Sequence, residues 1–306
     1  MSKAKTESAP ASAGERIAKV IARAGLCSRR EAERWIADGR VAVNGAVLDA
    51  PGVTVGASDS VTVDGQPLPE RVAARLWRYH KPEGLVTTHR DPDGRPTVFD
   101  ALPADLGRVI SIGRLDIASE GLLLLTNDGG LARRLELPAT AWTRRYRVRA
   151  FGRVDGAALD GLARGVTVDG VRYGKIEAAI DRLQGSNVWL TVALKEGKNR
   201  EVRRALEHIG LAVNRLIRVA YGPFQLGGLK RGEVAEVPAK VLRDQLGERP
   251  RKEKDKTRRE SSADGTGAGL CARPSTELAR PPIASARPCS TSSSMASIGT
   301  GPPVPA

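Results

Sequence analysis

Residues 113–129 read Gly-Arg-Leu-Asp-Ile-Ala-Ser-Glu-Gly-Leu-Leu-Leu-Leu-Thr-Asn-Asp-Gly. Asp116 lies in a short segment bounded by Gly113 and Gly121, directly before four consecutive leucines. A leucine run without polar alternation predicts a short strand buried on both faces, and a turn and a helix over residues 130–137 follow it. A single aspartate beside glycines is most often a turn former or a cap. A loop tied to a buried strand is nevertheless held rigidly, as a reactive side chain requires.

The overall composition points to a polyanionic partner. The 306 residues include 49 Lys and Arg against 35 Asp and Glu, which gives a formal net charge of +14. Such an excess favours nucleic acid over a membrane surface when no amphipathic or long apolar segment accompanies it. No run approaches the roughly 20 apolar residues of a membrane helix, and the N-terminus has no apolar signal core. We therefore expect a soluble, cytoplasmic protein with no membrane partner and with room for two domains.

Cysteine and histidine are scarce in this chain. The three cysteines and three histidines are too few and too scattered for a disulfide framework or a zinc-ligand pattern. We therefore expect chemistry that needs neither a metal ion nor another cofactor.

The first seventy residues predict a small module of two helices and a hairpin. Residues 1–14 are small and polar, and we expect a disordered lead-in. Helical spacing begins near Ile17. Ser28 and Glu31 have the spacing of a capping box, which starts a second helix. An Asn-Gly pair at residues 44–45 predicts a two-residue hairpin turn, and residues 67–70 have the composition of a linker.

Arginine is concentrated in this module, at Arg23, Arg29, Arg30, Arg34 and Arg40. A run of like charges is usually a solvated face. Here the arginines cluster around one helix start, where free backbone N–H groups also favour phosphate. We therefore predict that these five side chains contact nucleic acid.

Two later segments have clear periodic patterns. Over residues 143–150 arginine alternates with apolar or aromatic residues, which predicts a half-exposed strand. One face of that strand would carry Arg145, Arg147 and Arg149, and the other Tyr146 and Val148. Residues 197–200, Gly-Lys-Asn-Arg, open an amphipathic helix with Val202, Leu206 and Ile209 directed inward, and such a helix start suits phosphate.

Several separated segments together resemble the RsuA/RluB-type family of rRNA pseudouridine synthases. They are Lys-Pro-x-Gly at residues 81–84, Gly-Arg-Leu-Asp at 113–116, Arg-x-Tyr-x-Val at 144–148, the Gly-Lys-Asn-Arg helix start at 197–200, and Arg-x-x-Tyr-Gly-Pro at 218–223. The N-terminal module is similar to an S4-type RNA-binding domain. Ser119 stands where family members often carry threonine, and it keeps the hydroxyl group.

The resemblance implies an α+β architecture. A small S4-like α/β RNA-binding domain over residues 15–72 would precede a pseudouridine synthase catalytic domain over residues 76–243. The catalytic domain would be built on a mixed, largely antiparallel sheet. Residues 247–306 are basic and then rich in Ser, Ala, Pro and Gly, and we expect them to be disordered.

The resemblance also implies roles for individual side chains. Asp116 would be the catalytic residue and Tyr146 would stack on the extruded base, while Arg203, or alternatively Arg204, would pair with Asp116. Leu216 would either line the pocket under the uracil or pack in the core. Further RNA contacts would come from Arg95, Arg114, Lys198, Arg200 and Arg204.

The implied function is the isomerisation of one uridine in rRNA, with the large-subunit (23S) rRNA favoured. Asp116 would attack or deprotonate at the ribose, and the sequence leaves both first steps open. One alternative is a small-subunit (16S) rRNA target, and another is a non-catalytic S4-type RNA-binding or ribosome-assembly factor. We expect a monomer that meets its substrate in a pre-ribosomal particle.

Overall fold

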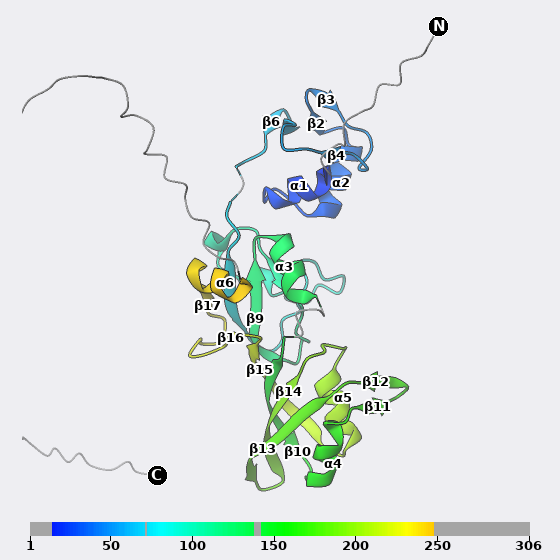
Figure 1. Ribbon diagram of the computed structural model, residues 1–306, viewed down its shortest axis with the longest axis vertical. Coiled ribbons are helices and arrows are strands. Elements are labelled where there is room, and N and C mark those ends of the chain that lie inside the picture. Colours follow the sequence, from blue (N-terminus) through cyan, green and yellow to red (C-terminus); the bar gives the residue numbers. More distant parts are fainter. Residues whose placement is uncertain (1–13, 71, 138–141, 248–306) are drawn as a thin grey trace, which may run out of the picture. The chain divides into compact units, whose positions relative to one another are not determined.

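The computed structural model describes residues 14–70, 72–137 and 142–247, and Figure 1 shows their helices and strands. The N-terminal part contains β1 (Glu15–Arg16), α1 (Ile17–Arg23), α2 (Arg29–Ala37), β2 (Val41–Val43), β3 (Ala46–Val47), β4 (Thr54–Val55), β5 (Val61–Val63) and β6 (Gln66–Pro67). Strands β3, β2, β5 and β6 form an antiparallel sheet in that order, and β1 pairs with β4. The disorder predicted for both termini falls almost wholly outside the described residues.

The local signals of the N-terminal module are confirmed. The Glu31 amide donates to Ser28 Oγ at 3.1 Å, and the Ser28 amide donates to the Glu31 carboxylate at 3.4 Å, so α2 begins with a complete capping box. Asn44 and Gly45 have φ values of 51° and 85°, as a two-residue hairpin turn requires. Ile17, Ile21 and other apolar side chains of α1, α2 and β2 form a compact cluster of their own.

One boundary in this region differs from the expectation. Pro67, predicted to lie in a linker, belongs to β6 and lies opposite Thr62 of β5, and Leu68 packs on the apolar cluster. Proline is tolerated there because β6 is an edge strand. The segment between the two predicted domains therefore starts after Leu68, and the limits 15–72 and 76–243 stay predictions.

The second part of the chain is organised around a nine-stranded sheet. Its elements are β7 (Leu76–Lys81), β8 (Ile110–Ile112), β9 (Glu120–Thr126), α3 (Gly129–Glu136), β10 (Arg144–Phe151), α4 (Gly156–Leu162), β13 (Ile176–Gln184), β14 (Asn187–Leu194), α5 (Glu201–His208), β15 (Ala212–Tyr221), β16 (Phe224–Gln225), β17 (Val234–Glu236) and α6 (Ala239–Leu246). The strand order is β13-β14-β10-β15-β9-β7-β17, with β16 beside β15 and β8 beside β9. A separate hairpin consists of β11 (Val166–Val168) and β12 (Val171–Tyr173).

Only the β15–β9 pair of this sheet is parallel among its described pairs. The mixed, largely antiparallel sheet is therefore as predicted. Every residue of β9 is buried, as the leucine run indicated. Leu123 and Leu125 belong to the apolar cluster that includes α4 and α5, whereas Leu122 and Leu124 belong to the cluster that includes α3 and α6. Strand β9 is thus covered on both faces.

Gly121 brings β9 and β15 unusually close together. It has φ +106° and lies in register with Arg218 of β15. A Cβ atom at this position would lie 2.3 Å from the Arg218 carbonyl oxygen and 2.7 Å from its amide nitrogen. Only glycine fits such an approach, so this residue sets how the loop before β9 meets β15.

Helices α4 and α5 cover one face of β13, β14 and β10 (Figure 1). Leu159 of α4 and Leu206 of α5 pack in the same cluster as Leu190 of β14 and Val148 of β10. The arginines of β10 alternate with these buried residues, which confirms the predicted half-exposed strand. The elements between residues 151 and 186 had no counterpart in the sequence expectations. In the described part of the chain, no helix combines the length and apolarity needed to cross a membrane.

Candidate active site

The loop from Arg114 to Ser119 is held through its backbone. Each of its six carbonyl oxygens accepts a hydrogen bond from another part of the chain. The donors, in loop order, are Arg218 Nη1 (3.5 Å), Thr87 Oγ1 (2.8 Å), Lys81 Nζ (3.2 Å), the Gly84 amide (2.8 Å), Arg203 Nη2 (2.7 Å) and again Lys81 Nζ (2.9 Å). Such a complete set of partners is unusual for a loop and leaves its backbone little freedom.

The Asp116 side chain contrasts with this backbone. Asp116 is half-buried, and among the described residues its carboxylate accepts no hydrogen bond. Its negative charge nevertheless acts on two cations, because it favours the charged forms of Lys81 and Arg203. The loop therefore presents a positioned carboxylate whose hydrogen-bonding capacity is unused, as a group that acts on a bound substrate requires.

Lys81 is the central support of the loop. It is fully buried at the end of β7, and its ammonium also donates to the Pro82 carbonyl oxygen at 3.0 Å. Burial lowers the pKa of Lys81 to about 8, although the charges of Asp116, Glu83 and Glu120 act in the opposite sense. Lys81 belongs to the Lys-Pro-x-Gly motif, but no role was predicted for it. The signal that could have identified it is its place on the same strand face as Trp77 and Tyr79, which are both buried.

Arg203 reaches the same loop from α5. It is 7% exposed, and its Nη1 donates to the Val213 carbonyl oxygen at 2.8 Å while its Nη2 donates to that of Ala118. Burial lowers the pKa of Arg203, and the nearby charge of Arg200 adds to this effect, whereas Asp116 opposes it. The guanidinium is thus joined to the loop through a backbone oxygen rather than through an ion pair with the carboxylate. Arg204, the alternative partner, is half-buried on the same helix.

Tyr146 and Leu216 line the neighbouring part of the sheet. Tyr146 of β10 lies opposite Arg218 of β15, and Leu216 lies opposite Val148. Tyr146 and Leu216 are 8% and 6% exposed and belong to the same cluster as Leu115 of the loop. The sheet therefore brings these two predicted residues to the side on which α5 holds the Asp116 loop.

Arg218 of β15 contacts both strand β9 and the loop that carries Asp116. Its Nε donates to the Leu122 carbonyl oxygen at 2.7 Å, in addition to the Arg114 contact, and its guanidinium lies 5.4 Å from the Tyr221 ring centre. Sequence reasoning placed Arg218 in the closing Arg-x-x-Tyr-Gly-Pro motif without a role. Three buried cations, Lys81, Arg203 and Arg218, therefore surround one carboxylate-bearing loop.

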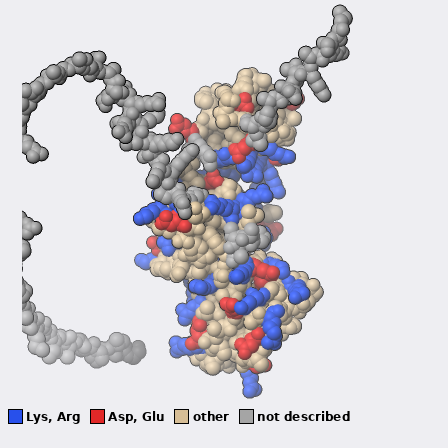
Figure 2. Space-filling model, in the orientation of Figure 1, with Lys and Arg blue, Asp and Glu red and all other residues tan. Residues whose placement is uncertain are grey.

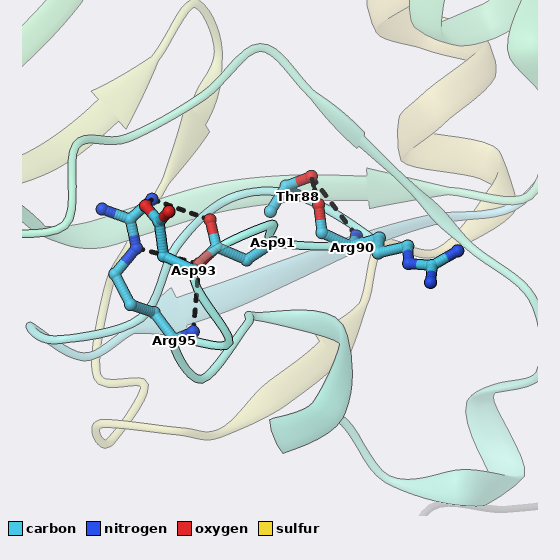
Figure 3. Close-up of polar contacts among 5 residues, drawn as sticks. All are labelled: Thr88, Arg90, Asp91, Asp93 and Arg95. Carbon is cyan, nitrogen blue, oxygen red and sulfur yellow. Dashed lines mark hydrogen bonds and ion pairs between the residues drawn. The ribbon is translucent and has the colours of Figure 1, made fainter.

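Several predicted RNA contacts are already occupied within the protein. Figure 3 shows the Arg95 guanidinium turned back onto its own loop, where it bonds Asp91 at 2.9 and 2.7 Å and lies 2.9 Å from Asp93. The hydrogen bond from Arg95 lowers the pKa of Asp91 to about 2. Arg90 of this loop extends away from the cluster (Figure 3).

The other predicted RNA contacts fall into two groups, those that already form an ion pair and those that do not. Arg40 forms a two-pronged ion pair with Asp64, Arg23 pairs with Glu15, and Lys198 lies 2.8 Å from Glu196. Arg29, Arg30, Arg34, Arg114 and Arg200 are exposed and form no ion pair within the described residues. Basic side chains cover more of the face drawn in Figure 2 than acidic ones do.

Arg200 has a backbone conformation that is rare for its residue type. Its φ and ψ are 50° and 28°, in the left-handed region, directly before α5. Elsewhere in the described residues, the non-glycine residues with positive φ are Asn or Asp in turns, which tolerate this region more readily. A strained residue at a helix start next to Arg203 is typical of a functional position.

Comparisons with known proteins agree with this geometry. Residues 15–61 match the S4 domain family and residues 75–208 match the RNA pseudouridylate synthase family. A Rickettsia felis protein described as an uncharacterized RNA pseudouridine synthase is 47% identical over 228 residues, which cover 74% of this chain and 99% of the relative. The chain belongs to the RNA pseudouridine synthase family.

Further relatives narrow the branch of this pseudouridine synthase family. Ribosomal large subunit pseudouridine synthase B of Yersinia pestis is 44% identical over 235 residues, covering 74% of each chain. A solved pseudouridylate synthase aligns with a TM-score of 0.52 and 26% identity over 74% of this chain and 98% of that one. The architecture of an S4 domain followed by a pseudouridine synthase domain, and the RluB-like resemblance, are thus confirmed. In the described residues, no group of three or more His, Cys, Asp or Glu side chains has a metal-binding arrangement.

Proposed function

We propose that this chain converts one specific uridine of large-subunit rRNA to pseudouridine, with Asp116 acting at the ribose. The observation that carries the proposal is the contrast within one loop: six bound carbonyl oxygens and one carboxylate without a hydrogen-bond partner among the described residues. A rigid backbone and a carboxylate with unused hydrogen-bonding capacity suit a residue whose partner is the substrate. The relatives named for the large subunit support the choice of rRNA.

The reaction replaces one bond between the sugar and the base by another. The N1–C1′ bond breaks and a C5–C1′ bond forms, while one proton leaves C5 and one is gained at N1, so atoms and electrons balance without a co-substrate. The uridine must first leave its stack, at a cost of a few kcal/mol. In this proposal Tyr146 stacks on the extruded base, and Leu216 contacts the ring from the apolar side of the pocket.

The three buried cations have two effects on Asp116. Their positive charges lie beside the position where the carboxylate acts, whether the first step is attack at C1′ or deprotonation of the ribose. Their hydrogen bonds to the loop carbonyls also keep the carboxylate in place while the base turns. We assign Arg203 as a positioning residue, because its guanidinium reaches the loop through the Ala118 carbonyl oxygen.

The proposed partners are rRNA and a pre-ribosomal particle, with the protein acting as a monomer in the cytoplasm. The RNA contacts in the S4 domain would come from Arg29, Arg30 and Arg34, whose side chains are exposed on α2. Arg23 and Arg40 would join them only after exchanging their carboxylate partners for phosphate.

The test maps pseudouridine in rRNA from cells that lack this protein, complemented with wild type or with Asp116→Asn. We expect one pseudouridine of large-subunit rRNA to disappear and only wild type to restore it. Restoration by Asp116→Asn would remove the catalytic assignment, and loss of a small-subunit pseudouridine would change the substrate. Unchanged pseudouridine with defective subunit assembly would favour a non-catalytic assembly factor.

A further inference from the structure

One face of the sheet in the catalytic domain remains open and basic. Residues directly opposite each other on neighbouring strands share a face. In this way Arg149 lies opposite Trp189 of β14 on one side and Arg215 of β15 on the other, and Trp189 lies opposite Arg182 of β13. A row of arginine, tryptophan, arginine and arginine therefore crosses four adjacent strands. We call these residues, together with Arg145 and Arg147 of β10, the arginine face.

The arginine face lies opposite the face that carries the proposed active site. The residues that alternate with its members, including Tyr146, Val148 and Leu190, pack in the cluster under α4 and α5. On the arginine face itself, Arg145, Arg147 and Arg182 are exposed, and Arg149, Arg215 and Trp189 are half-buried. Within the described ranges, no helix packs over these side chains.

Two of these arginines are held in place by other side chains. The Arg147 guanidinium lies 4.7 Å from the centre of the Trp189 ring, a cation–π distance. Arg215 Nε donates to Glu120, which is 3% exposed and also pairs with Arg231 at 2.8 Å. Burial would raise the pKa of Glu120, but its hydrogen bond with Arg215 and the nearby cations outweigh this effect and lower it. Glu120 is thus an ionised anchor for two surface arginines.

The placement of these charges is unfavourable in the absence of a ligand. The Cα atoms of residues two apart on β10 are about 7 Å apart, and the backbones of neighbouring strands are about 4.8 Å apart, so these arginines start from closely spaced positions. Both spacings are below the Debye length of about 8 Å at physiological ionic strength, so the repulsions are not screened away. Like charges directly opposite on a sheet, such as Arg149 and Arg215, destabilise it. Glu177 and Asp181 border this face on β13, and they already interact with Lys175 and Thr191.

We propose that the arginine face binds the phosphate backbone of rRNA that flanks the substrate uridine, as a second RNA surface on the side of the sheet away from Asp116. The face offers fixed guanidinium groups and no pocket for a base edge among its described residues, so recognition is of charge and independent of sequence. Trp189 is engaged with Arg147 and serves to fix that guanidinium. The inference rests on the proposed RNA substrate, but it does not depend on which chemical step Asp116 performs.

The test measures binding of the full chain, carrying Asp116→Asn, to a transcript of large-subunit rRNA at several salt concentrations. The variant replaces Arg145, Arg147 and Arg182 by Gln, because all three are exposed and none touches the loop of Asp116. A matched control replaces Arg153, Arg164 and Arg172 by Gln, which removes the same charge from exposed positions outside this face. Binding is measured without turnover, so its outcome is separate from that of the pseudouridine mapping.

We expect the first variant to weaken binding at least about tenfold at physiological salt. The slope of log K against log salt should become shallower by about 2, as the loss of three phosphate contacts predicts. Replacing the same three arginines by Lys should retain most of the affinity, since a point charge still attracts phosphate. The control should change the affinity less than about threefold. Equal weakening by both Gln variants, or an unchanged slope in the first, would overturn the proposal.

A second measurement covers the possibility that the triple variant unfolds. A photo-crosslinking amino acid at Thr191, which is exposed on the arginine face, should crosslink to the rRNA transcript. The same group at Thr167, exposed on β11, should crosslink much less. Crosslinking from Thr191 only to an acidic protein in a cell extract, and not to RNA, would assign this face to a different partner and contradict the proposal.

Discussion

The ammonium of Lys81 donates to the carbonyl oxygen of Asp116 at 3.2 Å, from a position where the Lys81 side chain is fully buried. The same ammonium binds the Ser119 carbonyl oxygen, so one charge holds both ends of the turn that carries the proposed catalytic acid. A neutral amine has only two hydrogens for these two carbonyl oxygens and that of Pro82, so at least one of the three hydrogen bonds would be lost. The loop should therefore respond to the protonation of Lys81.

Activity should fall as pH rises through about 8, because the pKa of Lys81 is lowered to about 8. Stability should respond in the opposite direction. The unfolded chain keeps its lysine protonated to a pKa of about 10.4, so between these values it binds more protons than the folded chain. The contribution of Lys81 to the free energy of unfolding should rise over this range by about 3 kcal/mol.

Lys81→Met provides the comparison for both measurements. Urea unfolding of wild type and variant should be followed from a pH of about 7.5 to a pH of about 10, which covers most of the interval between the two pKa values. The difference in unfolding free energy should grow with pH in favour of wild type. The single-turnover rate of the variant should lack the alkaline decline. A difference in unfolding free energy that stays constant with pH would show that Lys81 does not titrate in this range.

Arg203→Ala should lower the single-turnover rate by about 10²-fold, the size expected when a reacting group is displaced by about 1 Å. Arg203→Lys keeps the charge but cannot span the Val213 and Ala118 carbonyl oxygens in the same way. It should therefore recover only part of the rate, with RNA affinity unchanged. Arg204→Ala is the matched control on the same helix. A larger loss for Arg204→Ala than for Arg203→Ala would transfer the role to Arg204.

Gly121→Ala should destabilise the protein by about 3–5 kcal/mol, since overpacking and a positive φ both oppose it. The new methyl group would meet the Arg218 backbone at 2.3 Å, where nothing flexible can give way. Gly113→Ala is a suitable control, because Gly113 also has positive φ but, apart from its chain neighbours, no atom of the described residues lies within 4 Å of its added Cβ. It should cost about 1 kcal/mol. Equal losses in thermal unfolding would contradict the close approach of β9 and β15.

Arg95 and Arg200 should differ in their contribution to RNA affinity. Arg95→Gln should change the dissociation constant for rRNA less than about twofold, because Asp91 and Asp93 already neutralise this guanidinium. Arg200→Gly should weaken binding and yet stabilise the protein by about 1 kcal/mol, since it removes the strain of φ +50°. Filter binding and thermal unfolding on the same samples test both effects, and a destabilised Arg200→Gly variant would show that the residue is not strained.

Local signals in the sequence were sufficient for much of the fold. The capping box of Ser28 and Glu31, the Asn44-Gly45 turn, the buried strand after Asp116 and the alternation around Tyr146 were all predicted, because each depends on residues that are close in the chain. Strand β13 was missed, since it lies at an edge of the sheet and most of its residues are exposed, so it has no apolar alternation. The motifs also identified the pseudouridine synthase family.

The sequence by itself determined which acid is the candidate and which strand follows it. Only the tertiary structure decided what holds that acid, because Lys81, Arg203 and Arg218 reach the loop across 35, 85 and 104 residues. Their meeting depends on β7 and β15 flanking β9, an arrangement that no local pattern encodes. The physical reason is that a buried charge is stable only beside fixed oxygen partners, and these partners exist only once the sheet has formed.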